Sequence, residues 1–168
     1  MNKIFIAATH RVTATDLKSA KLGARFGRLD LQSQLALLAV EPFAAEFEKF
    51  PRDRIAICLA TNAGSLTTDW EFWKGNTVVG GPSPTLFAYT LPSAALGEIA
   101  IRHRLTGPNL CFIGNSENFL PEVEDLLRRN EADGCACVYC NVISEEVAKL
   151  IGISTSASAH ARFVILNR

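Results

Sequence analysis

The stretch from Ser83 to Ser116, SPTLFAYTLPSAALGEIAIRHRLTGPNLCFIGNS, decides which fold the sequence predicts. Small residues between Leu91 and Arg104 predict a closely packed helix, and the Gly107-Pro108 pair ends it. Leu110 to Ile113 then predicts a short strand, which leads into a polar corner and an amphipathic helix. The stretch therefore reads as helix, turn, strand, corner and helix.

The same alternation runs along the rest of the chain. The predicted strands are the apolar segments Lys3–Thr9, which we expect to be buried, Arg54–Ala60, Leu110–Ile113, Cys135–Val142 and Phe163–Leu166. The predicted helices are Leu29–Phe50, which Pro42 bends or divides, Leu91–Arg104, the segment through Val123, Leu126 and Leu127, and Glu145–Ile151. TNAGSLTTD (61–69) is a predicted loop leading to a short helix, and STSASAHA (154–161) a predicted flexible loop. Strands separated by helices indicate an α/β fold with a mainly parallel sheet.

Composition limits the class of protein. With 168 residues, 48% hydrophobic and 20% charged, the chain predicts one globular domain over residues 1–168. Seventeen basic residues balance seventeen acidic ones, which gives no electrostatic reason to expect nucleic acid or an anionic membrane as a partner. No apolar run approaches the roughly 18 residues of a membrane span, and we expect a cytoplasmic protein.

The five cysteines fit a reducing compartment. Three of them, Cys135, Cys137 and Cys140, lie in the apolar segment CACVYCNVI. A zinc site would need a fourth ligand and a loop around the metal, and neither is evident. We therefore predict buried thiols that act as small hydrophobic residues, and neither a metal nor a cofactor.

The run from Ser83 to Ser116 resembles the β-ketoacyl-acyl-carrier-protein synthases of the thiolase-like superfamily. It follows their order of Ser-Pro, small-residue helix, Gly-Pro turn, buried strand and nucleophile elbow without a gap. Upstream, RIAICLATNAG (54–64) resembles their strand and glycine loop, and RLDLQSQLALLAVE (28–41) their first long helix. Downstream, ADGCACVYC (132–140) resembles the strand after the nucleophile helix.

The resemblance covers only the amino-terminal half of such a synthase. It implies a thiolase-like half-domain, a five-stranded mixed sheet with helices on both faces and an antiparallel last strand. In that family a second, similar half packs against the first, so we expect an uncovered apolar face. The resemblance thus implies a homo- or hetero-oligomer, with an acyl carrier protein or a ketosynthase subunit as partner.

The resemblance places Ser116 where the family has its nucleophilic cysteine. Counting from Gly107-Pro108 without gaps puts Ser116 at the elbow, and the nearest cysteine, Cys111, lies inside the preceding strand. The family's two catalytic histidines come from the other half. None of the histidines of this chain matches them: His10, His103 and His160.

Several residues are open to more than one interpretation. Ser116, with Asn115 or Asn118, also fits a cap of the next helix, which competes with a role as nucleophile. We expect His103 at a helix end or on the surface, and His160 in the serine-rich loop. The aromatic residues Trp70, Phe72 and Trp73 fit a core or a subunit interface better than an acyl-binding site.

The predicted substrate-binding residues are Asn62, Gly64, Phe87, Tyr89 and Asn115, of which Phe87 and Tyr89 fit a subunit interface first. The favoured function is a non-condensing ketosynthase-like protein of a fatty-acid or polyketide-type pathway, aryl polyene synthesis being one example, which acts as a partner subunit. Such a protein is comparable to a chain-length factor, and we do not expect it to be an enzyme. Two alternatives stay open: a Ser116-dependent acyltransferase or hydrolase, and an interaction module that binds a carrier protein or synthase without contacting the acyl chain.

Overall fold

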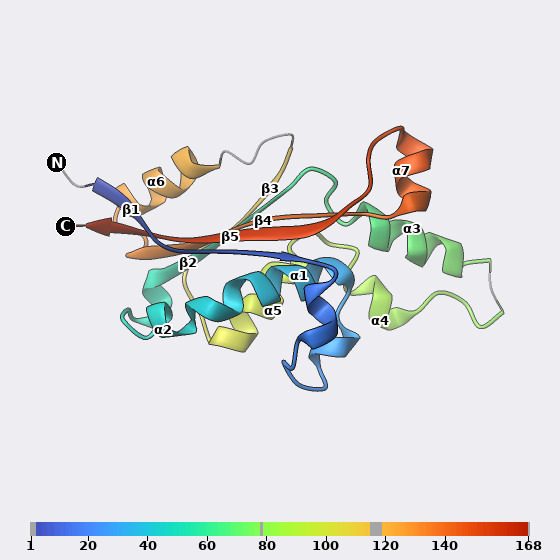
Figure 1. Ribbon diagram of the computed structural model, residues 1–168, viewed down its shortest axis with the longest axis horizontal. Helices are drawn as coiled ribbons and strands as arrows, with labels where there is room; N and C mark the ends of the chain where they lie inside the picture. Colours follow the sequence, from blue (N-terminus) through green and yellow to red (C-terminus); the bar gives the residue numbers. More distant parts are fainter. Residues whose placement is uncertain (1–2, 78, 115–118, 168) are drawn as a thin grey trace.

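The structure is a computed structural model that describes residues 3–77, 79–114 and 119–167. A five-stranded sheet crosses the molecule in the order β1-β5-β4-β2-β3 (Figure 1). The strands are β1 (Lys3–Thr13), β2 (Ile55–Thr61), β3 (Asn109–Ile113), β4 (Gly134–Ile143) and β5 (Ser156–Asn167). β2 runs parallel to β3 and β4, and β5 runs antiparallel to β1 and β4. The predicted mixed sheet with an antiparallel last strand is confirmed.

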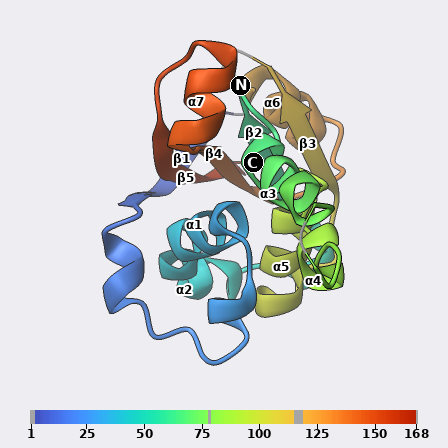
Figure 2. The same ribbon diagram turned by 90° about the vertical axis from the view of Figure 1, so that its right-hand side faces the viewer.

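Helices cover both faces of the sheet. The α-helices are α1 (Leu31–Val40), α2 (Ala44–Phe47), α3 (Leu66–Gly75), α4 (Pro84–Phe87), α5 (Ala94–His103), α6 (Leu120–Arg128) and α7 (Glu145–Ile151), and the 3-10 turns are Asp16–Ser19, Phe26–Arg28, Glu41–Phe43 and Arg52–Arg54. In Figures 1 and 2, α1, α2 and α5 lie on one side of the sheet, and α6 and α7 lie on the other. The predicted α/β architecture is therefore confirmed.

The two central strands, β2 and β4, form the core of the molecule. All seven residues of β2 are buried. Ile57 and Leu59 pack on the α1 and α5 side, whereas Ala56, Cys58 and Ala60 pack on the α6 side. A strand that is buried on both faces has no polar face, which explains why β2 reads as one continuous apolar run.

The first long helix is divided as the sequence predicts. Asp30 caps α1, because its side chain accepts a hydrogen bond from the Ser33 N–H at 3.0 Å. α1 ends at Val40, and the chain continues through a 3-10 turn that contains Pro42 into α2. A proline ring cannot continue the α-helical hydrogen-bond ladder, which accounts for the break.

The Gly107-Pro108 turn packs against the beginning of β2. A Cβ atom on Gly107 would overlap the carbonyl oxygen of Ile55 and lie 2.8 Å from its carbonyl carbon. The Pro108 carbonyl accepts a hydrogen bond from the Ile57 N–H at 2.9 Å. Glycine is required here because the two backbones are in direct contact. The Gly107-Pro108 pair is therefore explained by its close packing against β2.

Two strands differ from the prediction. β1 extends to Thr13 and is largely exposed, so the prediction of a short buried strand is wrong. β5 begins at Ser156, so the prediction of a flexible STSASAHA loop is wrong for most of that segment. The two strands pair with each other along most of their lengths. The hydrogen bonds of this pairing hold the small polar residues of β5 in an extended strand. The loop predicted within TNAGSLTTD is short, because α3 already begins at Leu66.

The α6 side of β1 and β5 is polar beyond the irregularity in β1 between Ile6 and Ala8. The residues on this side are Thr9, Arg11 and Thr13 of β1 and Ser158, His160 and Arg162 of β5. They alternate along each strand with the residues that face α1. The expected exposed apolar face is therefore wrong for this part of the sheet. Large exposed apolar side chains lie outside this region, and two of them, Leu91 and Ile113, lie near the end of β3.

Within the described residues, no helix combines the length and apolar character needed to cross a membrane.

Candidate functional site

The predicted nucleophile lies in the sequence between the end of β3 and the beginning of α6. The Gly114 N–H donates a hydrogen bond to the Thr61 carbonyl oxygen at 3.0 Å, which fixes the end of β3 beside the end of β2. Asn115 and Ser116 lie outside the described residues, and the description resumes at Phe119, directly before α6. The predicted strand and the predicted helix on either side of the corner are present, and the corner itself and the chemical role of Ser116 stay predictions.

The loop after β2 holds two of the predicted substrate-binding residues, Asn62 and Gly64. Asn141 of β4 anchors this loop, because its Oδ1 accepts hydrogen bonds from the Asn62 N–H at 2.7 Å and from the Thr61 hydroxyl at 3.2 Å. Gly64 has a φ of +58°, and a Cβ there would lie 3.2 Å from Pro92 Cγ. The positive φ and the close proline both favour glycine. The Asn62 side chain is exposed at the same loop.

Ser65 ties this loop to the segment that follows α4. Its Oγ lies 2.7 Å from the Thr90 carbonyl oxygen and 3.0 Å from Asp69 Oδ2. Burial raises the pKa of the Asp69 carboxyl, and the hydrogen bond from Ser65 opposes that rise. Ser65 is buried and lies between a carbonyl and a carboxylate, so it positions the loop. No pattern in the sequence indicates this contact.

Phe87 and Tyr89 lie in different environments. The Phe87 ring is 61% exposed and lies 5.3 Å from the Phe72 ring. The Tyr89 hydroxyl donates a hydrogen bond to Glu98 Oε1 at 3.2 Å, and Arg25 donates to both Glu98 oxygens at 2.9 and 3.2 Å. Burial and the Glu98 carboxylate raise the pKa of Tyr89. Tyr89 therefore belongs to the helical layer, and Phe87 remains at the surface.

Exposed apolar side chains lie on β3 and beside its end. Within the described residues β3 pairs with β2 alone, which leaves its other side unpaired. Ile113 of β3 is 65% exposed, and Cys111, two residues earlier in the same strand, is also exposed. Leu91, which follows α4, is 64% exposed. Gly64 approaches both Pro92 and Ile113, which places the segment after α4 beside the end of β3. We call Leu91, Cys111 and Ile113 the edge surface.

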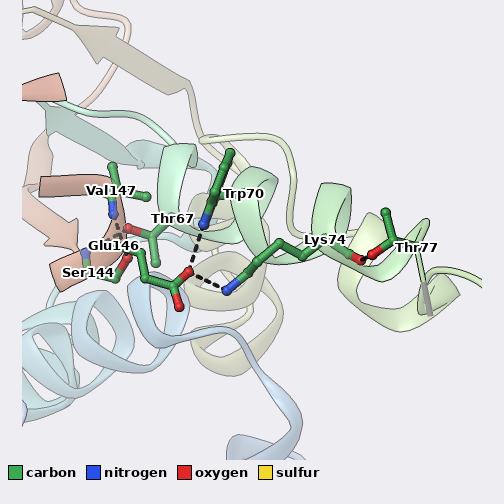
Figure 3. Close-up of polar contacts among 7 residues, drawn as sticks. All are labelled: Thr67, Trp70, Lys74, Thr77, Ser144, Glu146 and Val147. Atoms are coloured by element: carbon green, nitrogen blue, oxygen red, sulfur yellow. Dashed lines mark hydrogen bonds and ion pairs between the residues drawn. The ribbon is translucent and has the colours of Figure 1, made fainter. Parts of the chain in front are cut away.

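α3 and α7 lie side by side, and Glu146 of α7 contacts Trp70 and Lys74 of α3 (Figure 3). The Trp70 Nε1–H donates to Glu146 Oε2 at 2.8 Å, and Lys74 forms an ion pair with the same carboxylate. Trp70 stacks on Trp73 with 5.0 Å between ring centroids, and Trp73 is 57% exposed. The predicted aromatic cluster is therefore partly core and partly surface.

The histidines occupy three separate environments. His103 ends α5, but its side chain is only 6% exposed and its ring lies 5.2 Å from the Phe47 ring. The prediction of a helix-end residue is confirmed, and that of a surface side chain is wrong. His10 Nδ1 lies 3.3 Å from the Ala39 carbonyl oxygen. His160 lies in β5, so the prediction of a loop position is wrong.

The cysteines follow the prediction of buried thiols. Cys135, Cys137 and Cys140 are buried, as is Cys58, whose sulfur lies 3.4 Å from that of Cys135. Burial raises the pKa of the Cys111 thiol, which lies inside β3 and not at the elbow. In the part of the chain that the structure describes, no three potential ligands cluster in a way that would hold a metal ion.

One arrangement that sequence reasoning missed lies beside the start of α6. Tyr139 of β4 and His160 of β5 are direct cross-strand partners, and Arg162 is two residues further along β5. All three line a small hollow with Phe119 and Leu120. The sequence separates Tyr139 from His160 by a helix and a loop, so only the strand register could reveal that they meet.

Comparisons with known proteins give structural matches alone. No protein-family model matches the sequence, and no curated protein matches it. Its fold is similar to a chain in the structure of "Ketosynthase (ApeO) in Complex with its Chain Length Factor (ApeC) from Xenorhabdus doucetiae", with a TM-score of 0.71 and 14% identity over 96% of this chain and 78% of that chain.

Two further structures match over almost the whole of this chain. "The ishigamide ketosynthase/chain length factor" gives a TM-score of 0.78 and 16% identity over 96% of this chain and 62% of that chain. A type II PKS acyl-carrier protein in complex with its ketosynthase (AntDE:AntF) gives a TM-score of 0.77 and 12% identity over 98% of this chain and 62% of that chain. The chain thus has a ketosynthase-like, thiolase-type fold and spans less than two thirds of these last two chains.

Proposed function

We propose that this chain is a non-condensing, ketosynthase-like accessory subunit of a fatty-acid or polyketide-type pathway, aryl polyene synthesis among the candidates. Its partner would be a ketosynthase subunit, and an acyl carrier protein would be the second protein it meets. The observation that carries the proposal is an exposed apolar edge strand on a ketosynthase-like fold. The sequence resemblance, which places Ser116 at the position of the nucleophilic cysteine, supports it.

The residues available for chemistry support an accessory role. Condensation needs a thiolate, because thiolates are nucleophilic near neutral pH. Cys111 is the exposed thiol of the chain, but it lies within β3 and burial raises its pKa, which reduces the thiolate fraction. His103 is buried against Phe47, on the opposite side of the sheet from α6. Neither residue supplies the chemistry that the resemblance assigns to a condensing site.

The edge surface supports association with a second subunit. An unpaired edge strand presents free N–H and C=O groups, and an exposed apolar patch beside it costs free energy in water. A partner that adds a strand to β3 satisfies the backbone groups and covers Leu91 and Ile113 in the same step. Two of the matched structures are described as complexes of a ketosynthase with a chain length factor or with an acyl-carrier protein.

The test is co-expression with a ketosynthase subunit encoded by the same genome, followed by sedimentation analysis of the purified complex. Ile113→Lys places a charge on the edge surface. Burial of an isoleucine side chain contributes about 2 kcal/mol, so we expect this substitution to raise the Kd roughly 30-fold or more. Ile101→Lys is the matched control, because Ile101 is 62% exposed on α5, away from β3.

The outcomes separate the proposal from its alternatives. A stable complex that Ile113→Lys weakens and Ile101→Lys preserves supports the accessory role. Failure to bind any ketosynthase of that genome contradicts it. Binding to acyl carrier protein alone, with no ketosynthase complex, would favour the interaction module instead.

A further inference from the structure

Three strands place a cluster of hydrogen-bond donors on the α6 side of the sheet. Arg11, His160 and Tyr139 are consecutive partners across β1, β5 and β4, and Thr9 and Arg162 are partners in the next row. Directly paired side chains lie about 5 Å apart at Cβ, and diagonal ones about 7–8 Å apart. Long side chains can therefore converge on one point between these rows. We call these five residues the arginine cluster.

Three residues of the arginine cluster, Tyr139, His160 and Arg162, border a small hollow beside the start of α6. The hollow has a volume of about 10 Å³ and is lined by Phe119, Leu120, Cys137, Tyr139, His160 and Arg162. That volume holds one group of the size of a water molecule. Thr9 Oγ1 lies 3.0 Å from His160 Nε2, which orients the imidazole ring on this face. The hollow therefore has room for a single oxygen atom.

The charge of Arg162 is not balanced by a carboxylate among the described residues. Two other half-buried arginines each have one: Arg52 pairs with Glu48, and Arg54 pairs with Asp133 at 3.0 Å. Arg162 is half-buried like them, yet it takes part in no such pair within the described ranges. A half-buried guanidinium without a counterion favours the binding of an external anion.

Arg11 adds a second positive charge beside Arg162. It is exposed, and no ion pair joins it to a carboxylate in the described part of the chain. Asp16, near the end of β1, instead accepts hydrogen bonds from the Thr13 N–H at 2.7 Å and the Thr13 hydroxyl at 3.0 Å. The chain as a whole has a formal net charge of zero, so this local excess is not a consequence of a basic composition.

We propose that the arginine cluster binds a phosphate group. A phosphate monoester carries close to two negative charges and three acceptor oxygens, which match the two guanidinium groups together with the Tyr139 hydroxyl. Thr9 and His160 hold each other on this face, because the Thr9 hydroxyl donates to the Ala161 carbonyl oxygen at 3.3 Å and lies 3.0 Å from His160 Nε2. A carboxylate offers half the charge and fewer acceptors. This site does not depend on the edge surface, because β1 and β3 are opposite edges of the sheet.

The phosphate can be a free ion or the end of a larger ligand, and the experiment separates these sources. Purified protein is titrated at constant ionic strength with inorganic phosphate, 4'-phosphopantetheine, pantetheine and acetate, and the arginine Nε–H signals are followed by nuclear magnetic resonance. We expect the Nε–H signals of Arg11 and Arg162 to shift and saturate with inorganic phosphate and with 4'-phosphopantetheine. We expect no such shift with pantetheine or acetate at the same concentrations. Tighter binding of 4'-phosphopantetheine than of phosphate identifies the larger ligand, and equal binding identifies the free anion.

Matched variants test whether the site is specific. Arg162→Gln and Arg11→Gln remove one guanidinium each, and each is expected to raise the Kd about tenfold, the effect of losing a charge-assisted hydrogen bond. Arg28→Gln is the control, since Arg28 is exposed and also lacks a carboxylate partner among the described residues. Unfolding midpoints of all three are measured to verify folding. Absence of saturation, or an equal effect of Arg28→Gln, overturns the proposal.

Discussion

Gly107→Ala tests the contact on which the fold assignment rests. The added Cβ would lie 2.8 Å from the carbonyl carbon of Ile55 and 3.0 Å from the Asp53 carbonyl oxygen, and would overlap the Ile55 oxygen itself. The turn cannot move freely, because the Ile57 N–H donates to Pro108 at 2.9 Å and the Thr106 N–H donates to Arg52 at 3.0 Å. Relief of the overlap strains or breaks these bonds.

The cost follows from those contacts. Losing two main-chain hydrogen bonds costs about 1 kcal/mol each, and overpacking adds about 1–3 kcal/mol. We therefore expect the free energy of unfolding to fall by about 3–5 kcal/mol, and the melting temperature by roughly 6 °C or more. Urea unfolding and thermal melts followed by circular dichroism measure both quantities.

Gly97→Ala is the control for Gly107→Ala. Gly97 lies within α5, and a Cβ there would meet no atom within 4 Å. Alanine is favoured over glycine in a helix by about 0.5–1 kcal/mol, so we expect equal or greater stability. A Gly107→Ala protein within about 0.5 kcal/mol of the parent would refute the reasoning, since that is the range of an ordinary surface substitution. Equal losses in both variants would also refute it.

Two further predictions concern titratable side chains. Iodoacetamide is expected to label Cys111 in the folded protein and the four buried cysteines only in urea, as measured by peptide mass spectrometry. Because burial raises the pKa of Cys111, its labelling rate should increase with pH at higher values than for a free cysteine peptide; an equal profile would contradict this. Burial also lowers the pKa of His103 in the folded protein. As the pH drops, His103 therefore binds a proton in the unfolded chain before it does so in the folded protein, and the free energy of unfolding falls below about pH 6.5. His103→Phe should flatten that fall in urea unfolding curves at several pH values, and an unchanged slope would exclude His103 as its source.

The central part of the fold could be predicted from local sequence signals. β2 and β4 are apolar runs because both of their faces are buried. α7 spans Glu145–Ile151 as predicted, because Ser144 caps its first turn and Gly152 ends it with a positive φ. These features depend on neighbouring residues alone, which is why sequence reasoning finds them.

The outer strands and the donor cluster could not be predicted in this way. β1 and β5 are held by pairing between residues about 150 positions apart, such as Arg11 with His160. The small polar residues of β5 favour a loop until that partner is present. The meeting of Tyr139, His160 and Arg162 depends on the register of β4 and β5. Ser116 was located by spacing from Gly107, but spacing says nothing of the groups around its hydroxyl.

The most direct test of an accessory role is intact-mass spectrometry of the purified protein after incubation with acyl carrier protein that bears labelled acyl groups, with and without malonyl units. We predict no covalent acylation and no condensation product, because the resemblance places Ser116 where the family has its nucleophilic cysteine. We predict that Ser116→Cys gives at most a reactive thiol. An acyl adduct on the parent protein that Ser116→Ala abolishes would contradict the account and favour an acyltransferase or hydrolase.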